Sequence, residues 1–253
     1  MEDSNKLKLL ESLNYAVFKK LALDSDLSIY EKIGFPNSYR MEFEEKIFID
    51  INSKLNITSL KEKKILDIGC GCSNLVNILI NTCYTQHHEL FLIDSEEMLS
   101  NISVKNGYIS QPGYFPEMPE FLKQHANSFD IILCYSLLHY VFEEGNIFRF
   151  IDKACSLLNS GGSLLIGDIP NYTKRARFFL SEKGIQFHRE YVEDKEAMPD
   201  IKTYQLDERR IDDGVVMSIL MRYRNYGFET YLLPQKDDLP LANRREDILI
   251  VKR

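Results

Sequence analysis

One short stretch constrains this chain more than any other: Ile65-Leu66-Asp67-Ile68-Gly69-Cys70-Gly71-Cys72-Ser73. An apolar run ends in a carboxylate, two glycines follow at alternate positions, and a helical pattern opens at Asn74. This order predicts a buried strand, a tight turn and the start of a helix. Glycines at 69 and 71 allow positive φ and carry no Cβ, so a ligand can lie against the backbone. The free N–H groups of the helix start point at the same place, which suits a nucleotide-like ligand.

The composition narrows the class of protein. The chain has 253 residues, enough for one large domain or a domain with a small cap. Its net charge of −7 disfavours a nucleic-acid partner, because neutralising phosphates requires a basic surface. No apolar run reaches the length of a membrane span, and residues 1–6 lack the apolar core of a signal peptide. We therefore expect a cytoplasmic protein without a membrane partner, whose five cysteines are reduced.

The first quarter of the chain is predicted to be helical. Apolar residues recur at helical spacing over residues 4–22, with Ser4 as N-cap, and again over residues 41–55. No Gly/Ser-rich linker follows the second helix. We therefore predict a helical cap, residues 1–61, packed on a main domain of residues 62–253.

From residue 64 onward, apolar strands alternate with helical segments. The predicted strands are 64–68, 89–94, one within 108–115, 129–134, 163–166, 228–233 and 246–252. The predicted helices are 74–83, 96–102, 144–158 and 214–226, with Leu158 to Gly162 as the C-cap of the third. A further helical piece is predicted near residues 173–183, in an otherwise polar and irregular insert. Continuous apolar strands between helices indicate a parallel sheet covered on both faces, with binding turns at the carboxyl ends of its strands. The predicted fold is α/β: a Rossmann-like, doubly wound, seven-stranded sheet, mostly parallel with an antiparallel edge strand, plus N-terminal helices.

Two nucleotide ligands compete for the glycine turn. A dinucleotide fingerprint requires a third glycine where this chain has Asn74. The carboxylate of Asp67 sits poorly beside a pyrophosphate but suits an ammonium or sulfonium group. Asp94 ends the second strand about 20 residues after the turn, the interval at which a carboxylate binds ribose hydroxyls. These features favour S-adenosylmethionine over NAD.

Four segments, in order, resemble the motifs of class I S-adenosylmethionine-dependent methyltransferases. They are Asp67 to Ser73, Leu90 to Asp94, Ser128 to Tyr140, and Leu158 to Ile166, within roughly residues 62–168. The chain departs from the pattern at Ser73, where many members carry a third glycine; serine is small and can cap the helix. It also lacks the acidic residue that often meets the adenine amino group after the third strand. Tyr114 or Phe115 stands there, and either could lie against the ring.

The resemblance implies a set of cofactor-binding residues. Asp67 or its neighbouring backbone would meet the methionine end, and Asp94 would bind the ribose. The glycines would line the cofactor, and the backbone near the end of the fourth strand would close over the methionine moiety. The full set is Asp67, Gly69, Cys70, Gly71, Asp94, Ser95, Cys134 and Tyr135.

Catalytic candidates follow the fourth and fifth strands. Methyl transfer requires alignment and, for a hydroxyl or amine acceptor, loss of a proton. His139 could act as a base facing the acceptor, or it could be a helix histidine that makes a packing hydrogen bond. Asp168 could orient an acceptor, or it could stabilise a turn. We take both as catalytic candidates.

Substrate-binding candidates come from segments outside the strands: Tyr39 and Arg40 in the break between the first helices, Asn171 after the fifth strand, and His188 in the insert. A basic cluster could bind a phosphate or carboxylate of the substrate, or it could be the solvated face of a helix; it comprises Lys174, Arg175 and Arg177. The pair Cys70 and Cys72 lies where a metal would compete with the cofactor, and no second pair has zinc-site spacing, so no metal is expected.

We therefore predict an S-adenosylmethionine-dependent methyltransferase with a substrate lid near residues 170–212. Its partner is a small-molecule acceptor, with a hydroxyl of a metabolite or sugar as the first candidate. The alternatives are an NAD-dependent oxidoreductase and a non-catalytic S-adenosylmethionine-binding protein. The prediction allows for a homodimer and leaves the acceptor open.

Overall fold

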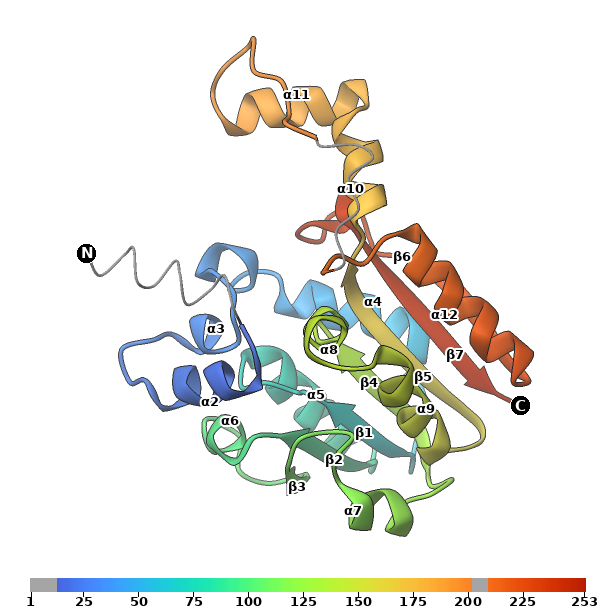
Figure 1. Ribbon diagram of the computed structural model, residues 1–253. Helices are drawn as coiled ribbons and strands as arrows, with labels where there is room; N and C mark the ends of the chain where they lie inside the picture. Colours follow the sequence, from blue (N-terminus) through green and yellow to red (C-terminus); the bar gives the residue numbers. More distant parts are fainter. Residues whose placement is uncertain (1–12, 202–208) are drawn as a thin grey trace.

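The computed structural model describes residues 13–201 and 209–253 (Figure 1). Seven strands form one sheet in the order β3-β2-β1-β4-β5-β7-β6. Strands β1 to β5 run parallel, whereas β7 is antiparallel to both its neighbours. This confirms the predicted fold, with the antiparallel strand one place in from the edge. The strands are β1 (Lys64–Ile68), β2 (Glu89–Asp94), β3 (Ile109–Pro112), β4 (Phe129–Tyr135), β5 (Leu158–Pro170), β6 (Phe228–Pro234) and β7 (Arg245–Lys252).

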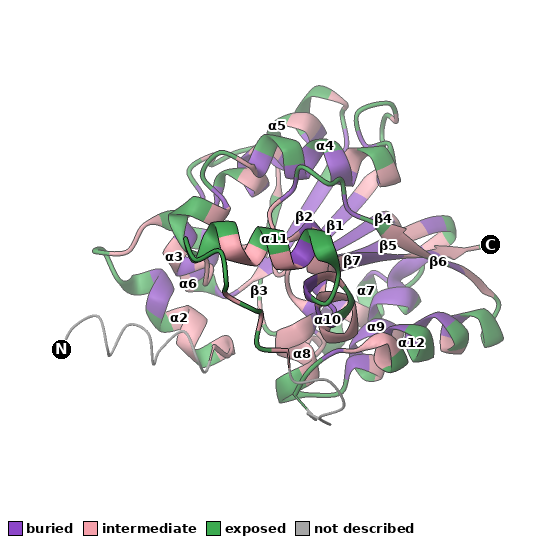
Figure 2. Ribbon diagram, turned by 90° about the horizontal axis from the view of Figure 1, so that it is seen from above, coloured by how far each residue is buried: buried purple, intermediate pink, exposed green. Residues whose placement is uncertain are grey.

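Helices cover both faces of the sheet, as continuous apolar strands require. One face buries apolar residues of α7, α9 and α12, and the other buries those of α4, α5 and α6. The buried sheet between the two layers is visible in Figure 2. The helices of the first half are α2 (Tyr15–Leu23), α3 (Ile29–Lys32), η1 (Asn37–Tyr39), α4 (Glu44–Leu55), α5 (Asn74–Thr85), α6 (Glu96–Ser100) and α7 (Pro119–Gln124). Those of the second half are α8 (Leu138–Glu144), α9 (Ile147–Leu157), α10 (Tyr172–Phe179), α11 (Glu182–Tyr191), α12 (Asp213–Asn225) and η2 (Ala242–Arg244).

The helices before β1 share the core of one sheet face. Ile47 and Ile51 of α4 are buried in the same cluster as β1 and α5. Helix α2 lies against α6. Lys32 of α3 connects the two helices, because its Nζ donates hydrogen bonds to the carbonyl of Ala22 in α2 and to Oδ1 of Asn101, which follows α6. Residue Ser4, the predicted N-cap, lies outside the described residues; within them, α2 begins at Tyr15. The division of the chain at residues 61 and 62 stays a prediction.

The third predicted helix ends where the sequence indicated, with Leu158 as the C-cap of α9, but the predicted role of the two glycines in the cap is wrong. Helix α9 ends at Leu157, and Leu158 is already extended and paired with Phe129 of β4. The two glycines of this segment, Gly161 and Gly162, therefore lie within β5 rather than at a helix end. The pairing of β4 with β5 shifts register between this pair and the next, Ile131 with Ser163, and the two glycines lie in that irregular part of β5.

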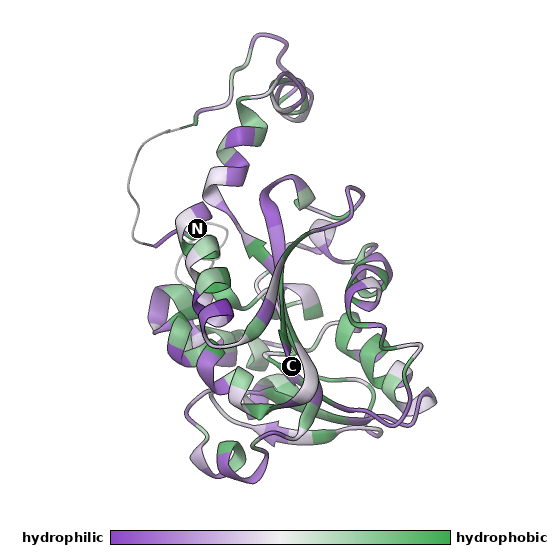
Figure 3. Cartoon of the chain, turned by 90° about the vertical axis from the view of Figure 1, so that its right-hand side faces the viewer, coloured by the Kyte–Doolittle hydropathy of each residue, from purple (hydrophilic) through white to green (hydrophobic). Residues whose placement is uncertain are grey.

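The insert after β5 contains more helix than predicted. The sequence suggested one helical piece near residues 173–183, but α10 and α11 both form, and α11 projects away from the sheet (Figure 1). Figure 3 shows mixed hydropathy on this projecting part. No helix within the described residues has the length and hydrophobicity needed to span a membrane.

Candidate functional site

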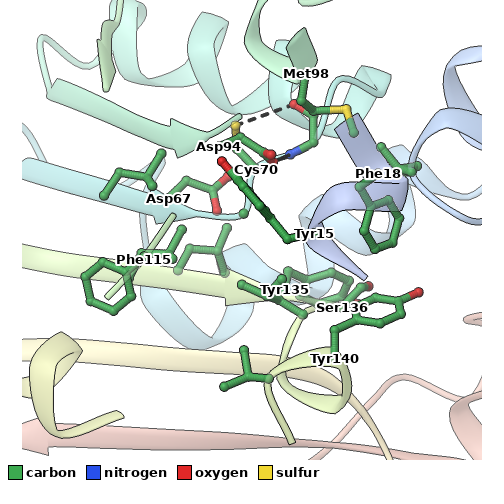
Figure 4. A pocket seen from close by; sticks show the side chains of 18 of the residues that line it. Tyr15, Phe18, Asp67, Cys70, Asp94, Met98, Phe115, Tyr135, Ser136 and Tyr140 are labelled. Carbon is green, nitrogen blue, oxygen red and sulfur yellow. Dashed lines mark hydrogen bonds between the residues drawn. The ribbon is translucent and has the colours of Figure 1, made fainter. Parts of the chain in front are cut away.

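A cleft opens at the carboxyl ends of β1, β2 and β4, enclosed in part by α2 and the segment before α4. Its empty volume is about 1110 Å³, a figure that includes space open to solvent. In Figure 4, Asp67, Cys70 and Asp94 lie together, and Tyr135, Ser136 and Tyr140 lie across from them. The cleft therefore extends from the glycine turn to the residues that follow β4.

The glycine turn forms one wall of the cleft. Gly69 and Gly71 have φ of +71° and +65°, the left-handed region that glycine adopts without strain. A Cβ at Gly69 would lie 2.7 Å from Leu137 Cδ2. The N–H of Gly69 donates to the carbonyl of Ile93 at 2.8 Å, which ties the turn to β2. Glycine at position 69 is thus required by both backbone conformation and space.

Helix α5 begins after this turn, but Ser73 does not cap it through its side chain. Instead, Glu44 Oε1 of α4 accepts a hydrogen bond from the N–H of Leu75 at 3.1 Å. The helix start is therefore capped by a carboxylate from the N-terminal segment.

Asp94 joins the turn to the end of β2. Its Oδ2 accepts a hydrogen bond from the N–H of Gly71 at 2.9 Å, and its Oδ1 accepts one from the N–H of Ser95 at 2.7 Å. Burial raises the pKa of Asp94 to about 6, although both N–H donors lower it. The carboxylate is thus held in a fixed orientation at the cleft wall and is mostly ionised at neutral pH.

Asp67 ends β1 at the base of the cleft and is buried. Among the described residues, its carboxylate has no hydrogen-bond partner. Burial, and then the charge of Asp94, raise the pKa of Asp67 to about 8. A buried carboxyl group without a partner favours either a proton or a cationic ligand group, such as an ammonium or a sulfonium.

Aromatic rings form the opening of the cleft. The rings of Tyr15 and Tyr114 have centroids 4.6 Å apart, and those of Phe18 and Tyr140 lie 4.9 Å apart, edge to face. Tyr114 and Phe115, the two sequence candidates for the adenine contact, both line the cleft. Flat apolar walls of this kind suit a planar base.

The opposite end of the cleft is charged. Arg40 Nη2 donates hydrogen bonds to Ser136 Oγ at 2.5 Å and to Asp168 Oδ2 at 3.3 Å. The Ser136 hydroxyl in turn donates to Asp168 Oδ2 at 2.5 Å. Although burial raises it, the pKa of Asp168 is held below its usual value by Arg245, Arg40 and Ser136. Asp168 is therefore an ionised carboxylate clamped by cations.

The backbone at this end is strained. Ser136 and Asp168 have φ of +57° and +59°, which are uncommon for residues other than glycine. The N–H of Ser136 donates to the carbonyl of Gly167 at 3.0 Å, so the ends of β4 and β5 hold each other in these conformations. Strained positions cluster at functional sites, where surrounding contacts maintain them.

A buried network supports the charged end from behind. The N–H of Asp168 donates to Asp247 Oδ1 at 2.9 Å. Lys54 Nζ lies 2.6 Å from both Asp50 Oδ2 and Asp247 Oδ2. Gln235 Nε2 donates to Asp247 Oδ1 at 3.1 Å, and weakly to Asp168 Oδ1 at 3.4 Å. The network fixes the position of Asp168 through α4, β7 and the loop after β6.

A model of a protein family described as "Methyltransferase domain" matches residues 59–204. This chain belongs to that methyltransferase family. With this assignment, its cofactor is S-adenosylmethionine rather than NAD, and the NAD-dependent oxidoreductase alternative is set aside. The partnerless carboxyl group of Asp67 and the glycine turn fit that cofactor.

Solved methyltransferases share the fold of the chain. The plantazolicin methyltransferase BpumL, in a complex with SAH and a monoazolic desmethylPZN analog, has a TM-score of 0.60 at 14% identity, covering 99% of this chain and 98% of that one. The CurJ carbon methyltransferase has a TM-score of 0.58 at 14% identity, covering 98% and 67%. A putative S-adenosylmethionine-dependent methyltransferase from Listeria monocytogenes has a TM-score of 0.52 at 15% identity, covering 82% and 98%. A search of curated protein sequences gave no match.

The methyltransferase cleft brings together many of the predicted cofactor-binding residues. Its lining includes Asp67, Gly69, Cys70, Gly71, Asp94 and Tyr135. Two others lie behind it: Ser95 is buried and caps α6 by accepting a hydrogen bond from the N–H of Met98, and Cys134 is fully buried in the core. Their roles toward the cofactor stay predictions.

Neither catalytic candidate lines the cleft itself. Asp168 lies behind Ser136 and Arg40 and lines the small adjoining cavity, whereas His139 lines neither. The imidazole Nδ1 of His139 is enclosed and has no hydrogen-bond partner among the described residues. Burial, and then the neighbouring charge of Arg245, lower the pKa of His139 to about 3. The imidazole is therefore neutral and a weak base.

The substrate-binding candidates are dispersed. Arg40 lines the cleft, and Tyr39 lines a small adjoining cavity beside Asp168. Asn171 is buried and caps α10, and its amide donates to Asp213 and Glu246. His188 lies on α11, outside the cleft lining.

Several lining residues were missed by the sequence analysis: Tyr15, Phe18, Phe35, Ser136 and Tyr140. The aromatic residues carry only a helical or break pattern in the sequence, which does not indicate what they face. Ser136 could have been found from its position: a polar residue directly after a buried parallel strand lies at the carboxyl edge of the sheet, where ligands bind.

Proposed function

We propose that this methyltransferase methylates a hydroxyl group of a small molecule. The observation that carries the proposal is the continuity of the cleft from the glycine turn to Ser136 and Arg40, with Asp168 directly behind them. One end of the cleft suits a nucleoside, and the other presents polar atoms to a second molecule. A site of this form aligns two reactants, which is the main requirement of a displacement reaction.

At the cofactor end, Asp67 would face the cationic methionine portion and Asp94 the ribose hydroxyls. The backbone of Gly69 and Gly71 allows close approach, and Tyr114 would contact the adenine. When bound, S-adenosylmethionine supplies a methyl group that its sulfonium already activates. The chain's own task is therefore positioning and exclusion of water rather than activation of the donor.

At the acceptor end, Ser136 Oγ receives a hydrogen bond from Arg40 and donates one to Asp168. We propose that the acceptor hydroxyl donates to Ser136 Oγ and that Asp168 receives its proton through Ser136. Asp168 is ionised across the neutral range, because Arg245 and Arg40 outweigh its burial. We assign His139 a packing role, since it does not line the cleft and its Nδ1 has no hydrogen-bond partner among the described residues.

The solved methyltransferases that share this fold do not indicate which acceptor atom is methylated. One is named a carbon methyltransferase, and another binds analogs of a desmethylated plantazolicin, so proteins of this fold serve different acceptors. The choice of a hydroxyl rests on Ser136 and Asp168, which together can receive one proton.

The test is a transfer assay with tritiated S-adenosylmethionine and acceptors that differ only in the reacting group: hydroxyl, amine or activated carbon. We expect transfer to hydroxyl compounds. Asp168→Asn should lower kcat by about 10²-fold, the scale of general base catalysis, with little change in cofactor affinity. His139→Gln should keep its activity within a few fold. Cofactor binding without transfer to any acceptor would favour a non-catalytic S-adenosylmethionine-binding protein, and transfer only to amines or carbon would overturn the hydroxyl assignment.

A further inference from the structure

Helix α10 carries three cations in a chain of net charge −7, and two of them are already neutralised. Lys174 Nζ donates to the carbonyl of Arg245 at 2.7 Å and lies 3.8 Å from Glu246 Oε1. Arg177 is paired with Asp213. Arg175 has no carboxylate partner among the described residues. Its guanidinium lies over the ring of Phe179, 5.2 Å from the centroid.

A second unpaired guanidinium shares that ring. Arg244, the last residue of η2, lies 5.1 Å from the centroid of Phe179. Its Nε donates to Asn243 Oδ1 at 3.1 Å, and no described carboxylate pairs with it. Burial, and then the charge of Arg175, lower the pKa of Arg244. Two like charges are thus held close together, and no carboxylate of residues 13–201 or 209–253 forms an ion pair with either.

A third basic side chain faces the same ring. The imidazole of His188 lies 6.4 Å from Phe179, centroid to centroid, at 90°. Phe179 is buried, so it forms a fixed floor beneath groups from α10, α11 and η2. A guanidinium group whose plane is already fixed can bind a carboxylate or phosphate through two hydrogen bonds, with little further loss of side-chain entropy.

This cluster lies beside the acceptor end of the cleft. The N–H of Asn171 donates to the carbonyl of Arg244 at 3.0 Å, so η2 is attached to the end of β5. Arg245, the next residue, donates to the carbonyl of Asp168 at 2.9 Å. Figure 1 shows α10 rising from that end of β5. Arg244 is therefore one residue away from a side chain that is hydrogen-bonded to Asp168.

We infer that Arg175 and Arg244, with His188 beside them, bind an anionic group of the methyl acceptor, either a carboxylate or a phosphate. The inference rests on the proposed function, which places the acceptor at Asp168. It narrows the acceptor to a molecule with a hydroxyl at one end and an anionic group at the other.

The first test uses calorimetry at low salt on the complex with S-adenosylhomocysteine, with pyrophosphate and succinate as probes. We expect Arg175→Gln and Arg244→Gln each to weaken the preferred probe at least about tenfold, as loss of a charged hydrogen-bonding partner requires. Arg177→Gln is the matched control, because it removes a neutralised cation from the same helix; it should change affinity less than about twofold. Arg175→Lys should recover part of the affinity.

The outcomes separate the two proposals. Stronger binding of pyrophosphate indicates a phosphate group, and stronger binding of succinate a carboxylate. Equal affinity in the parent and both arginine variants, or no binding of either probe, overturns the inference. Efficient transfer to a neutral hydroxyl compound with a KM unchanged in Arg175→Gln would overturn it while leaving the proposed function intact. Probe binding that the variants abolish, without transfer to any hydroxyl, would refute the proposed function alone. Unchanged affinity for S-adenosylhomocysteine in every variant shows that folding is preserved.

Discussion

Arg40 and Asp168 form a buried ion pair, with 3.3 Å between Arg40 Nη2 and Asp168 Oδ2. Their side chains are only 6% and 9% exposed. The pair joins the segment before the sheet to the end of β5, so the N-terminal helices are attached to the acceptor end of the cleft by charge as well as by apolar packing.

Arg40→Gln should destabilise the protein by about 3 kcal/mol, because it leaves Asp168 and Ser136 without one of their buried donors. Urea denaturation measures the loss. Lys46→Gln is the control: Lys46 and Asp238 also form an ion pair, at 3.6 Å, but both are about half exposed, so its loss should cost less than about 1 kcal/mol. Equal effects of the two substitutions would contradict the role given to the buried pair.

Binding of S-adenosylmethionine should release a proton at pH 7. In the free protein, the pKa of Asp67 is raised to about 8, so the carboxyl group is largely protonated at that pH. A cationic ligand favours the ionised form, so the proton must leave when the ligand binds. Affinity should therefore rise with pH and level off above about 8. Calorimetry in buffers of different ionisation enthalpy measures the release, which Asp67→Asn should abolish. Identical binding enthalpies in all buffers would refute the contact between Asp67 and the cationic part of the ligand.

Asp94→Ala should weaken the binding of S-adenosylmethionine at least about tenfold. The substitution removes a carboxylate that accepts hydrogen bonds from the ribose hydroxyls, each worth ~1.5–3 kcal/mol. It also leaves the N–H of Gly71 without the Asp94 carboxylate that accepts its hydrogen bond. Glu96→Gln, an exposed carboxylate two residues away, is the control and should bind the cofactor normally. An unchanged dissociation constant for Asp94→Ala would mean that the ribose lies elsewhere.

Comparison of Gly69→Ala with Gly161→Ala separates the cost of backbone strain from the cost of a steric clash with the added Cβ. Both glycines have positive φ, so alanine should cost about 1 kcal/mol at either position. Only at Gly69 does the added Cβ meet another atom, Leu137 Cδ2, whereas nothing lies within 4 Å at Gly161. Gly69→Ala should lose cofactor affinity as well as stability, and Gly161→Ala stability alone. Thermal unfolding and calorimetry measure the two effects, and equal cofactor affinity in both variants would refute the role of the turn.

The fold could be predicted because each central strand is an apolar run bounded by turn residues. The glycine turn and the two acids, Asp67 and Asp94, could likewise be found, since they occupy fixed places relative to strand ends. Helix α11 was missed because its residues are largely polar and it projects from the domain. The Gly161-Gly162 pair was assigned to a helix cap because glycine occurs both at helix ends and at bends in strands.

The charged end of the site could be predicted only in part. Arg40 and Asp168 were each chosen as candidates, but they are 128 residues apart in sequence, and nothing in the local pattern pairs them. Ser136 was missed because its role depends on a strained backbone conformation that neighbouring strands enforce. Periodicity identified the apolar face of α2 but could not show that Tyr15 faces the cleft.

The most direct test is a crystal structure with bound S-adenosylhomocysteine. The account predicts that the ribose lies against the carboxylate of Asp94, that the amino group lies near Asp67, and that the sulfur faces Ser136. A nucleoside bound away from Asp94, or a sulfur directed away from Ser136 and the Arg40–Asp168 pair, would contradict it.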